Sequence, residues 1–456
     1  MKLTSINPSD NSVIGEVEIT TAEEIQNIVE KAHKAKENWK NLGIEGRNKY
    51  LLKFYDTIEQ HADELALLQS KEMGMPINEA KEDVAGGIKY LRWYSAHANE
   101  SLSPEVTYED DNEKNVVYYE PRGVVAVIIA WNFPMSNFVW QCGQNLVAGN
   151  VIVLKTSEEV PLFSKMLEEI TTESGLPECV LSIVYGDGIV GDVLAHQNVD
   201  MICFTGSTKI GQQLYKVAAE KFIPVLLEMG GSAPGIIFED ADIPAVIDTI
   251  ILNRFLNCGQ ICDGLKRLIV HKSRFDETIK LLLEKIAEKK VGIATDEINN
   301  MGPLVAERQV IALEAQVADA VSKGAKILVG GIRPEGLNGA FYLPTLLTGV
   351  TKDMQVWQEE VFGPVLPVVS FETEEEAIAL ANDTMYGLGG YVFTQDKAKF
   401  ERVALQINTG MVSQNNLGYC KESNPFGGYK KSGMGREHGK FGFHDVTQIK
   451  IVAIEK

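Results

Sequence analysis

Hydrophobic and polar positions divide the chain into two patterns. Residues 21–100 alternate charged and apolar positions at helical spacing, most regularly over 21–42 and 47–73, and therefore predict helices. From residue 124 onward, continuous apolar runs replace this pattern, as is typical of parallel strands buried on both faces. The runs are 124–130, 151–154, 181–184, 201–204 and 224–227, with helical stretches such as 162–174 and 210–221 between them. This alternation predicts an α/β fold with a Rossmann-like, doubly wound sheet.

A second series of apolar runs predicts a second α/β domain from about residue 231. Its predicted strands are 235–238, 267–270, 325–329 and 364–370, and its predicted helices are 275–289 and 373–382. Thr373, followed three residues later by Glu376, indicates a capping box at the start of the last helix. Two further strand candidates, 115–120 and 447–454, lie outside both series, and isolated strands commonly pair with another element such as a second subunit.

Composition and charge exclude several classes of protein. A formal net charge of −20 argues against partners such as nucleic acids and anionic membrane surfaces, because both are themselves negatively charged. The six cysteines are sparse and show no paired metal-ligand spacing, so we expect no metal site and a reducing, cytoplasmic location. The N-terminus lacks the apolar segment of a secretory signal, and no apolar run reaches the ~18 residues that span a membrane.

Cys262 is the strongest candidate for chemistry. It lies in the segment 255–264, Phe-Leu-Asn-Cys-Gly-Gln-Ile-Cys-Asp-Gly, whose small residues would give a substrate access to the sulfur. A thiol is a strong nucleophile only as thiolate. Glu228, in Leu-Glu-Met-Gly-Gly, could activate water, and a thiol together with such a base indicates acyl-enzyme chemistry. The alternative for an isolated cysteine is simple packing in a core.

Three further segments could bind a nucleotide or stabilise charge. Thr-Gly-Ser-Thr-Lys-Ile-Gly at 205–211 follows a strand and opens a helix, where backbone amides bind phosphate, although it is not a GxGxxG fingerprint. Lys155 and Glu158 follow a parallel strand and could hold ribose hydroxyls, with the carboxylate repelling a 2′-phosphate and so favouring NAD over NADP. Asn132 could donate its side-chain amide to an oxyanion. The alternative for each segment is a plain turn or a solvated surface pair.

Taken together, these motifs resemble the aldehyde dehydrogenase family, in the family's order and near its spacing, from Asn7-Pro8 to the C-terminal strand. The matching segments are Trp131-Asn-Phe-Pro134, Lys155 with Glu158, Phe204-Thr-Gly-Ser207, Glu228-Met-Gly-Gly231, Phe255–Cys262, Glu360-Val-Phe-Gly-Pro364 and Pro425-Phe-Gly-Gly428. The resemblance implies a cofactor-binding domain (1–108 and 122–230), a catalytic domain (231–431) and an oligomerisation arm (109–121 and 432–456). It also implies homodimers or homotetramers.

The resemblance also assigns roles to individual residues. Cys262 would attack the aldehyde carbonyl, Asn132 and the Cys262 backbone N–H would stabilise the oxyanion, and hydride would pass to the nicotinamide. Glu228 would then activate water to hydrolyse the thioester, in contrast to relatives that pass the acyl group to coenzyme A. The residues implied for the cofactor are Trp131, Lys155, Glu158, Gly206, Ser207, Glu360 and Phe362.

The substrate residues depart from the succinate-semialdehyde dehydrogenases that the chain otherwise resembles. Those relatives typically carry arginine nine residues after the motif tryptophan and often six before the cysteine. Here the two positions are Trp140 and Leu256. A substrate carboxylate buried without a cation would be costly. Asp263 should further repel an anionic substrate and raise the thiol pKa, unless it points away and caps a turn.

We therefore expect an apolar, aromatic-walled substrate tunnel and a neutral aliphatic or aromatic aldehyde. The expected lining is Phe133, Trp140, Leu256, Asp263, Cys420 and Phe426. Lys421 or Arg254 could still supply a positive charge, and succinate semialdehyde remains the alternative substrate. Two competing functions are a catalytically silent nucleotide-binding protein and a thioester hydrolase or esterase without redox activity. Cys258 could form a protective disulfide with Cys262 if both lie on one helix, since residues four apart come within disulfide range.

Overall fold

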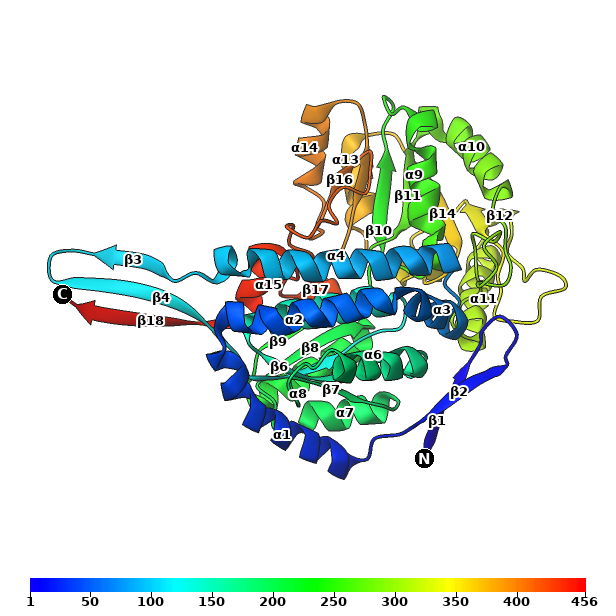
Figure 1. Ribbon diagram of the computed structural model, residues 1–456. Coiled ribbons are helices and arrows are strands. Elements are labelled where there is room, and N and C mark those ends of the chain that lie inside the picture. Colours follow the sequence, from blue (N-terminus) through cyan, green and yellow to red (C-terminus); the bar gives the residue numbers. More distant parts are fainter.

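The first large sheet is six-stranded, and five of its strands carry the first series of apolar runs. The computed structural model describes residues 1–456 throughout (Figure 1). The strand order is β17-β9-β8-β5-β6-β7, in which all neighbours are parallel except β17 on β9. Every residue of β5 and β6 is buried, which explains their lack of polar alternation. The strands are β5 (Val124–Ile128), β6 (Val151–Lys155), β7 (Leu181–Val184), β8 (Met201–Gly206), β9 (Val225–Met229) and β17 (Gly433–Met434).

Helices cover this sheet, and the N-terminal helical prediction is confirmed. The helices are α1 (Ala22–Asn41), α2 (Gly43–Gln60), α3 (Ala62–Met73), α4 (Ile77–Leu102), α5 (Pro134–Ala148), α6 (Pro161–Glu173), α7 (Gly188–His196), α8 (Thr208–Lys221) and α15 (Gly439–Asp445). Their apolar faces and the strands share one core, in which Trp39, Phe54 and Phe138 are among the largest buried side chains. A hairpin that the apolar runs did not predict, β1 (Lys2–Ile6) with β2 (Val13–Glu18), precedes α1.

The second large sheet is seven-stranded and forms its own core, as the second series of runs predicts. Its order is β12-β13-β14-β11-β10-β15-β16, and only the β12–β13 pair is antiparallel. The strands are β10 (Ala233–Ile237), β11 (Leu265–His271), β12 (Lys326–Val329), β13 (Thr345–Thr348), β14 (Val365–Phe371), β15 (Tyr391–Phe393) and β16 (Ser413–Gln414). The helices are α9 (Ile243–Phe255), α10 (Phe275–Ala287), α11 (Glu307–Ser322), α12 (Gln355–Gln358), α13 (Glu374–Asn382) and α14 (Lys397–Ala404).

The predicted capping box at the start of α13 is half formed. The Thr373 side chain accepts a hydrogen bond from the backbone N–H of Glu376 at 3.2 Å. The Glu376 carboxylate accepts from the backbone N–H of Glu372 instead of returning to Thr373. The helix start is therefore capped as the sequence indicates, but its second bond lies one residue earlier.

The two isolated strand candidates pair with each other in a third sheet, which projects from the body (Figure 1). Its order is β18 (Thr447–Glu455), β4 (Glu113–Pro121) and β3 (Glu105–Glu109), all antiparallel. This sheet begins at Glu105, four residues before the expected limit of the arm. Residues 433–434 pair with β9 and α15 packs against α4, so this part of the segment 432–456 belongs to the body. None of the helices is long and apolar enough to cross a membrane.

Candidate active site

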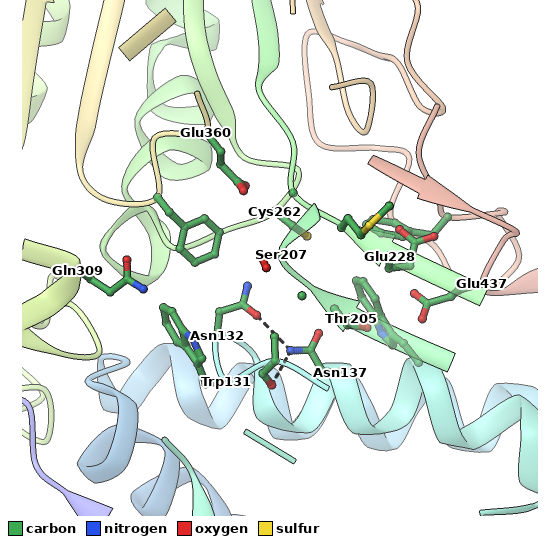
Figure 2. Close-up of a pocket in the computed structure, with 17 residues that line it drawn as sticks. Trp131, Asn132, Asn137, Thr205, Ser207, Glu228, Cys262, Gln309, Glu360 and Glu437 are labelled. Carbon is green, nitrogen blue, oxygen red and sulfur yellow. Dashed lines mark hydrogen bonds between the residues drawn. The ribbon is translucent and has the colours of Figure 1, made fainter. Parts of the chain in front are cut away.

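A cavity of about 230 Å³ lies where residues from the two large sheets meet (Figure 2). Asn132 follows β5, Glu228 is on β9, and Cys262 precedes β11, so these three side chains reach the cavity from different segments. The other lining residues include Trp131, Asn137, Trp140, Thr205, Gly206, Ser207, Glu360, Phe362, Phe426 and Glu437. The fold therefore brings the predicted nucleophile, base and oxyanion donor to one space.

The loop before Cys262 is held in an unusual backbone conformation. Asn257 and Cys258, in a 3₁₀ turn over Leu256–Gly259, have φ angles of 47° and 54°, which non-glycine residues rarely adopt. Such strain persists where neighbouring contacts fix it. The Asn257 backbone N–H donates to Glu79 Oε2 at 2.7 Å, and its side-chain amide donates to the Asn132 carbonyl at 2.6 Å. These contacts fix the position from which the chain reaches Cys262.

The Cys262 thiol lies in surroundings that favour its protonated form. Burial raises its pKa well above the usual value, and the Asp263 carboxylate raises the pKa further. Lys266 acts in the opposite direction. Asp263 Oδ1 lies 4.0 Å from the Cys262 sulfur, and Asp263 Oδ2 accepts a hydrogen bond from the Tyr419 hydroxyl at 3.0 Å. The predicted effect of Asp263 on the thiol pKa thus has a geometric basis, and thiolate formation needs a base or a compensating charge.

Glu228 is buried together with a second carboxyl group, Glu437. Neither Glu228 oxygen has a hydrogen-bond partner, and Oε1 of Glu437 has none. Burial raises the pKa of Glu228 well above its usual value, and the negative charge of Glu437 raises it further. Burial raises the pKa of Glu437 to about 8. Two buried carboxyl groups whose charges interact favour a state in which at least one holds a proton at neutral pH.

Sequence reasoning missed Glu437, although the segment beside it is rich in glycine. β17 pairs with β9 so that Gly433 lies opposite Glu228, and this register brings the residues after β17 to the base. The backbone N–H and carbonyl of Glu437 pair with those of Phe426 at 2.8 Å, which returns the chain to the cavity. The signal in the sequence was the run of glycines at 427–435, whose backbones must approach other segments closely.

The predicted cofactor residues fall into two groups. Lys155, the last residue of β6, pairs through Nζ with Glu158 Oε2 at 3.2 Å, outside the catalytic cavity. Gly206 and Ser207 line that cavity, and Ser207 caps α8 by accepting from the Ile210 N–H. A Cβ at position 206 would lie 2.5 Å from the Phe204 ring, so only glycine fits there. This open backbone at a helix N-terminus suits a pyrophosphate.

The other predicted cofactor residues meet on the far side of the same cavity. The rings of Trp131 and Phe362 pack edge to face, with centroids 5.6 Å apart. Glu360 lines the cavity and forms an ion pair with Lys266, while its Oε1 accepts from the Gly231 N–H at 3.1 Å. A carboxylate and a flat aromatic side chain beside Cys262 fit the ribose and nicotinamide of NAD(P). Lys266, which contacts Glu360, was not among the predicted residues.

A second cavity of about 310 Å³ adjoins Cys262 and corresponds to the expected substrate tunnel. The expected residues Phe133, Trp140, Leu256, Asp263 and Cys420 line it, together with Ile261, Tyr391, Leu417 and Tyr419. Phe426 does not line this cavity; its ring packs 4.9 Å from Trp140 and faces the catalytic cavity. Asp263 faces the cavity and does not cap a turn away from it.

The expectation of an apolar tunnel is incomplete, because α4 adds three carboxyl groups to the wall. Glu79, Glu82 and Asp83 all line the second cavity, and no lysine, arginine or histidine does. Arg254 is fully buried and donates to the carbonyls of Val361 and Gly363, away from this wall. Lys421 is exposed and lines neither cavity. Nothing near Asp263 in the sequence predicts this acidic face, since α4 lies far earlier in the chain.

The proposed Cys258–Cys262 disulfide rested on a wrong local structure. Cys258 lies in a 3₁₀ turn with positive φ, and Cys262 lies beyond that turn in a loop, so the two are not on one α-helix. Both cysteines are free. Cys258 is completely buried in the core of the second sheet, whereas Cys262 lines the cavities. Simple packing in a core therefore describes Cys258.

Comparison with known proteins gives the same assignment along almost the entire chain. Residues 1–452 match the model of the aldehyde dehydrogenase family. Glutarate-semialdehyde dehydrogenase of Pseudomonas aeruginosa is 36% identical over 450 residues, covering 98% of this chain and 93% of that protein. Peroxisomal aminoaldehyde dehydrogenase 2 of Pisum sativum is 38% identical over 458 residues, covering 98% and 91%.

Among solved structures, a crystal structure described as an E. coli NADP dependent enzyme superposes with a TM-score of 0.97 at 32% identity. The match covers 100% of this chain and 95% of that one. The sheets, the cavity and the sequence similarity agree from one end of the chain to the other. The chain belongs to the aldehyde dehydrogenase family.

Proposed function

We propose that this enzyme oxidises a neutral or cationic aldehyde to its carboxylic acid with NAD, through a covalent intermediate on Cys262. The observation that supports this most is the meeting of Cys262, Asn132 and Glu228 at one cavity. A thiol nucleophile, an amide donor and a carboxyl base are the groups that acyl-enzyme formation and hydrolysis require. A catalytically silent protein has no need of all three.

The chain's own residues account for the steps around the reacting carbon. The Cys262 thiolate forms the carbon–sulfur bond, and the oxyanion accepts hydrogen bonds from the Asn132 amide and the Cys262 backbone N–H. Bound NAD(P) supplies the hydride acceptor. Glu228, once deprotonated, removes a proton from the water that cleaves the thioester, which releases the acid and returns the thiol. Trp131 and Phe362 limit access of bulk water to this space.

The cofactor preference follows from Glu158. Its carboxylate is paired with Lys155 and would stand where a ribose is expected, so the extra phosphate of NADP would meet a negative charge. The E. coli enzyme of similar structure is described as NADP dependent, so the preference needs a direct test. The test is to measure kcat/KM for NAD and for NADP from initial rates. A higher kcat/KM with NADP would reject the preference for NAD.

The proposed substrate class rests on the lack of a cation in the second cavity. Its wall carries Asp263 and the three carboxyl groups of α4 and no cation, so a substrate carboxylate would find no partner. The similar Pisum sativum protein is named an aminoaldehyde dehydrogenase, and the Pseudomonas aeruginosa protein is named for a semialdehyde. We expect the order of kcat/KM to place 3-aminopropanal, hexanal and benzaldehyde above succinate semialdehyde.

Succinate semialdehyde is the second candidate substrate, supported by the similarity to a glutarate-semialdehyde dehydrogenase. A clear preference for it in the same aldehyde panel would overturn the proposal of a neutral or cationic substrate. NADH formation followed by absorbance separates a dehydrogenase from a silent nucleotide-binding protein. Ester hydrolysis without cofactor, measured beside it, identifies an esterase without redox activity.

The projecting sheet supports a homodimer or homotetramer. Ile449 and Ile451 on β18 are 71% and 64% exposed, and apolar side chains along a long strand favour burial against another surface. Light scattering coupled to gel filtration would report the mass of the assembly. Charged substitutions at both isoleucines should reduce that mass, and a monomeric parent enzyme would contradict the proposal.

A further inference from the structure

Lys266 is a fully buried cation to which the steps above give no role. It is the second residue of β11, and its Nζ donates to the Cys262 carbonyl at 3.1 Å and to the Gly231 carbonyl at 2.9 Å. Its third partner is the Glu360 carboxylate, with which it forms an ion pair. An ammonium group has three hydrogens, so these three acceptors satisfy it completely. Removing a charge from water is costly unless it is paired in this way.

The three acceptors belong to three segments that build the site. Cys262 carries the proposed nucleophile, Gly231 follows the strand that carries Glu228, and Glu360 lies in the loop before β14. The Gly231 N–H also donates to Glu360 Oε1, so that carboxylate is held from two sides. A Cβ at position 231 would lie 2.5 Å from the Cys262 carbonyl oxygen, which only glycine avoids. Lys266 therefore joins the nucleophile loop to the end of the base-bearing strand.

The same ammonium group carries the charge that opposes the carboxylates around the thiol. Asp263, Glu360 and Glu228 all raise the pKa of Cys262 in addition to burial, and Lys266 lowers it. Nζ lies 3.1 Å from the carbonyl oxygen of Cys262 itself, in a site without exposure to screening solvent. A positive charge held against the backbone of Cys262 favours the ionised form of its thiol.

We propose that Lys266 is a positioning residue that holds the Cys262 loop against Gly231 and Glu360 and supplies the positive charge that favours the Cys262 thiolate. The proposal rests on the proposed function in taking Cys262 as the nucleophile. Lys266, at the start of β11, would then assist catalysis through Cys262 without contacting the substrate. Loss of the charge should change the ionisation of the thiol, whereas a purely structural residue should change only stability.

The test is the pH dependence of Cys262 alkylation by iodoacetamide in the enzyme without cofactor. A Cys262→Ala variant gives the background, because Cys420 is more exposed than Cys262. In Lys266→Met we expect the thiol pKa to rise by about one unit and alkylation below that pKa to slow about tenfold.

Arg267→Met is the matched control. Arg267 is the next residue of β11, equally buried, and donates to the carbonyls of Ser232, Leu380 and Ala381 on the other side of the strand.

An unchanged thiol pKa in Lys266→Met, or an equal rise in Arg267→Met, would overturn the proposal. If Lys266→Met does not fold, Lys266→Gln decides, because its side-chain amide can still donate hydrogen bonds in place of the ammonium group but carries no charge. That variant should raise the thiol pKa by about one unit, and no change or a fall would count against Lys266. Alkylation needs neither aldehyde nor cofactor, so a lack of dehydrogenase activity would count against the proposed function alone.

Discussion

The side-chain amide of Asn132 donates a hydrogen bond to the carbonyl oxygen of Gln260 at 3.0 Å. This bond ties the turn after β5 to the loop that carries Cys262, two residues before the nucleophile. The Asn132 side-chain oxygen in turn accepts from Asn137 Nδ2 at 3.1 Å, which orients the amide (Figure 2). An amide nitrogen has two hydrogens, so one remains free to donate to an oxyanion. The residue therefore has a structural bond and a free donor at once.

Replacing Asn132 by alanine should lower kcat about 100- to 1000-fold, the loss typical of one oxyanion donor. KM for the cofactor should change little, because the hydrogen bonds of the Asn132 side chain go to Gln260 and Asn137 and to no predicted cofactor residue. Asn137→Ala is the comparison: it removes the orienting bond but leaves the donor, so its loss of kcat should be smaller. Equal losses in the two variants would show that the Cys262 loop has moved and that the donor itself matters little.

Replacing Glu228 by glutamine should separate the two halves of the reaction. Thioester formation does not need this carboxylate, so a rapid burst of NADH close to one equivalent should persist. Steady-state turnover should fall more than about 100-fold because water is no longer activated. In the parent enzyme the raised pKa of Glu228 means that the active, deprotonated form increases as pH rises, so kcat should climb toward alkaline pH. A variant with normal turnover and no burst would exclude Glu228 as the base.

Glu437 should make the protein less stable as pH rises. Its pKa is raised to about 8 in the folded state, above its value in an unfolded chain, so the folded state holds the proton more tightly. The associated stability is present below the unfolded pKa and is lost as pH rises through about 8. Glu437→Gln should therefore keep roughly 1–3 kcal/mol that the parent loses between pH 5 and 9. Urea unfolding across that range measures this, with exposed Glu178→Gln as the control that should follow the parent.

The parallel strands could be predicted from the sequence, because a strand buried on both faces appears in the sequence as a continuous run of apolar residues. The runs at β5, β6, β8 and β9 contain almost only apolar residues, and each became a parallel strand. Short strands without such a run, such as β13, β15 and β16, were missed. Their residues are buried by neighbours that the sequence places far away, so no local periodicity marks them.

The residues of the site likewise divide into those that a local sequence motif predicts and those that it does not. Cys262, Glu228 and Asn132 each stand in a segment with its own local signal, and the fold brings all three to one cavity. Lys266 and the carboxyl groups of α4 have no such signal, and Glu437 has only the glycines that precede it, because these residues matter through packing against residues distant in the chain. Cys258 shows the opposite error, since a spacing of four suggested a helix where the backbone turns through positive φ.

Removing the charge of Glu158 should relax the cofactor preference. Glu158→Gln keeps the size of the side chain but no longer repels a 2′-phosphate, and it leaves Lys155 free to attract one. We expect the ratio of kcat/KM for NADP over NAD to rise about tenfold, mostly through KM for NADP. The neighbouring Glu159, which pairs with Arg308, provides the matched control as Glu159→Gln. An equal change in both variants would indicate a general effect of surface charge.

Replacing Asp263 by asparagine should act on the nucleophile and on substrate choice together. The carboxylate raises the pKa of the Cys262 thiol more than any other neighbouring charge, so its removal should lower that pKa and speed iodoacetamide alkylation at pH 7 about tenfold.

The same change removes one of the four carboxyl groups on the tunnel wall. The ratio of kcat/KM for succinate semialdehyde over 3-aminopropanal should therefore rise. Glu82→Gln, on the more exposed part of the wall, should change this ratio without changing alkylation, since Glu82 is not among the charges that most strongly shift the thiol pKa. Faster alkylation with an unchanged substrate ratio would show that tunnel charge does not select the aldehyde.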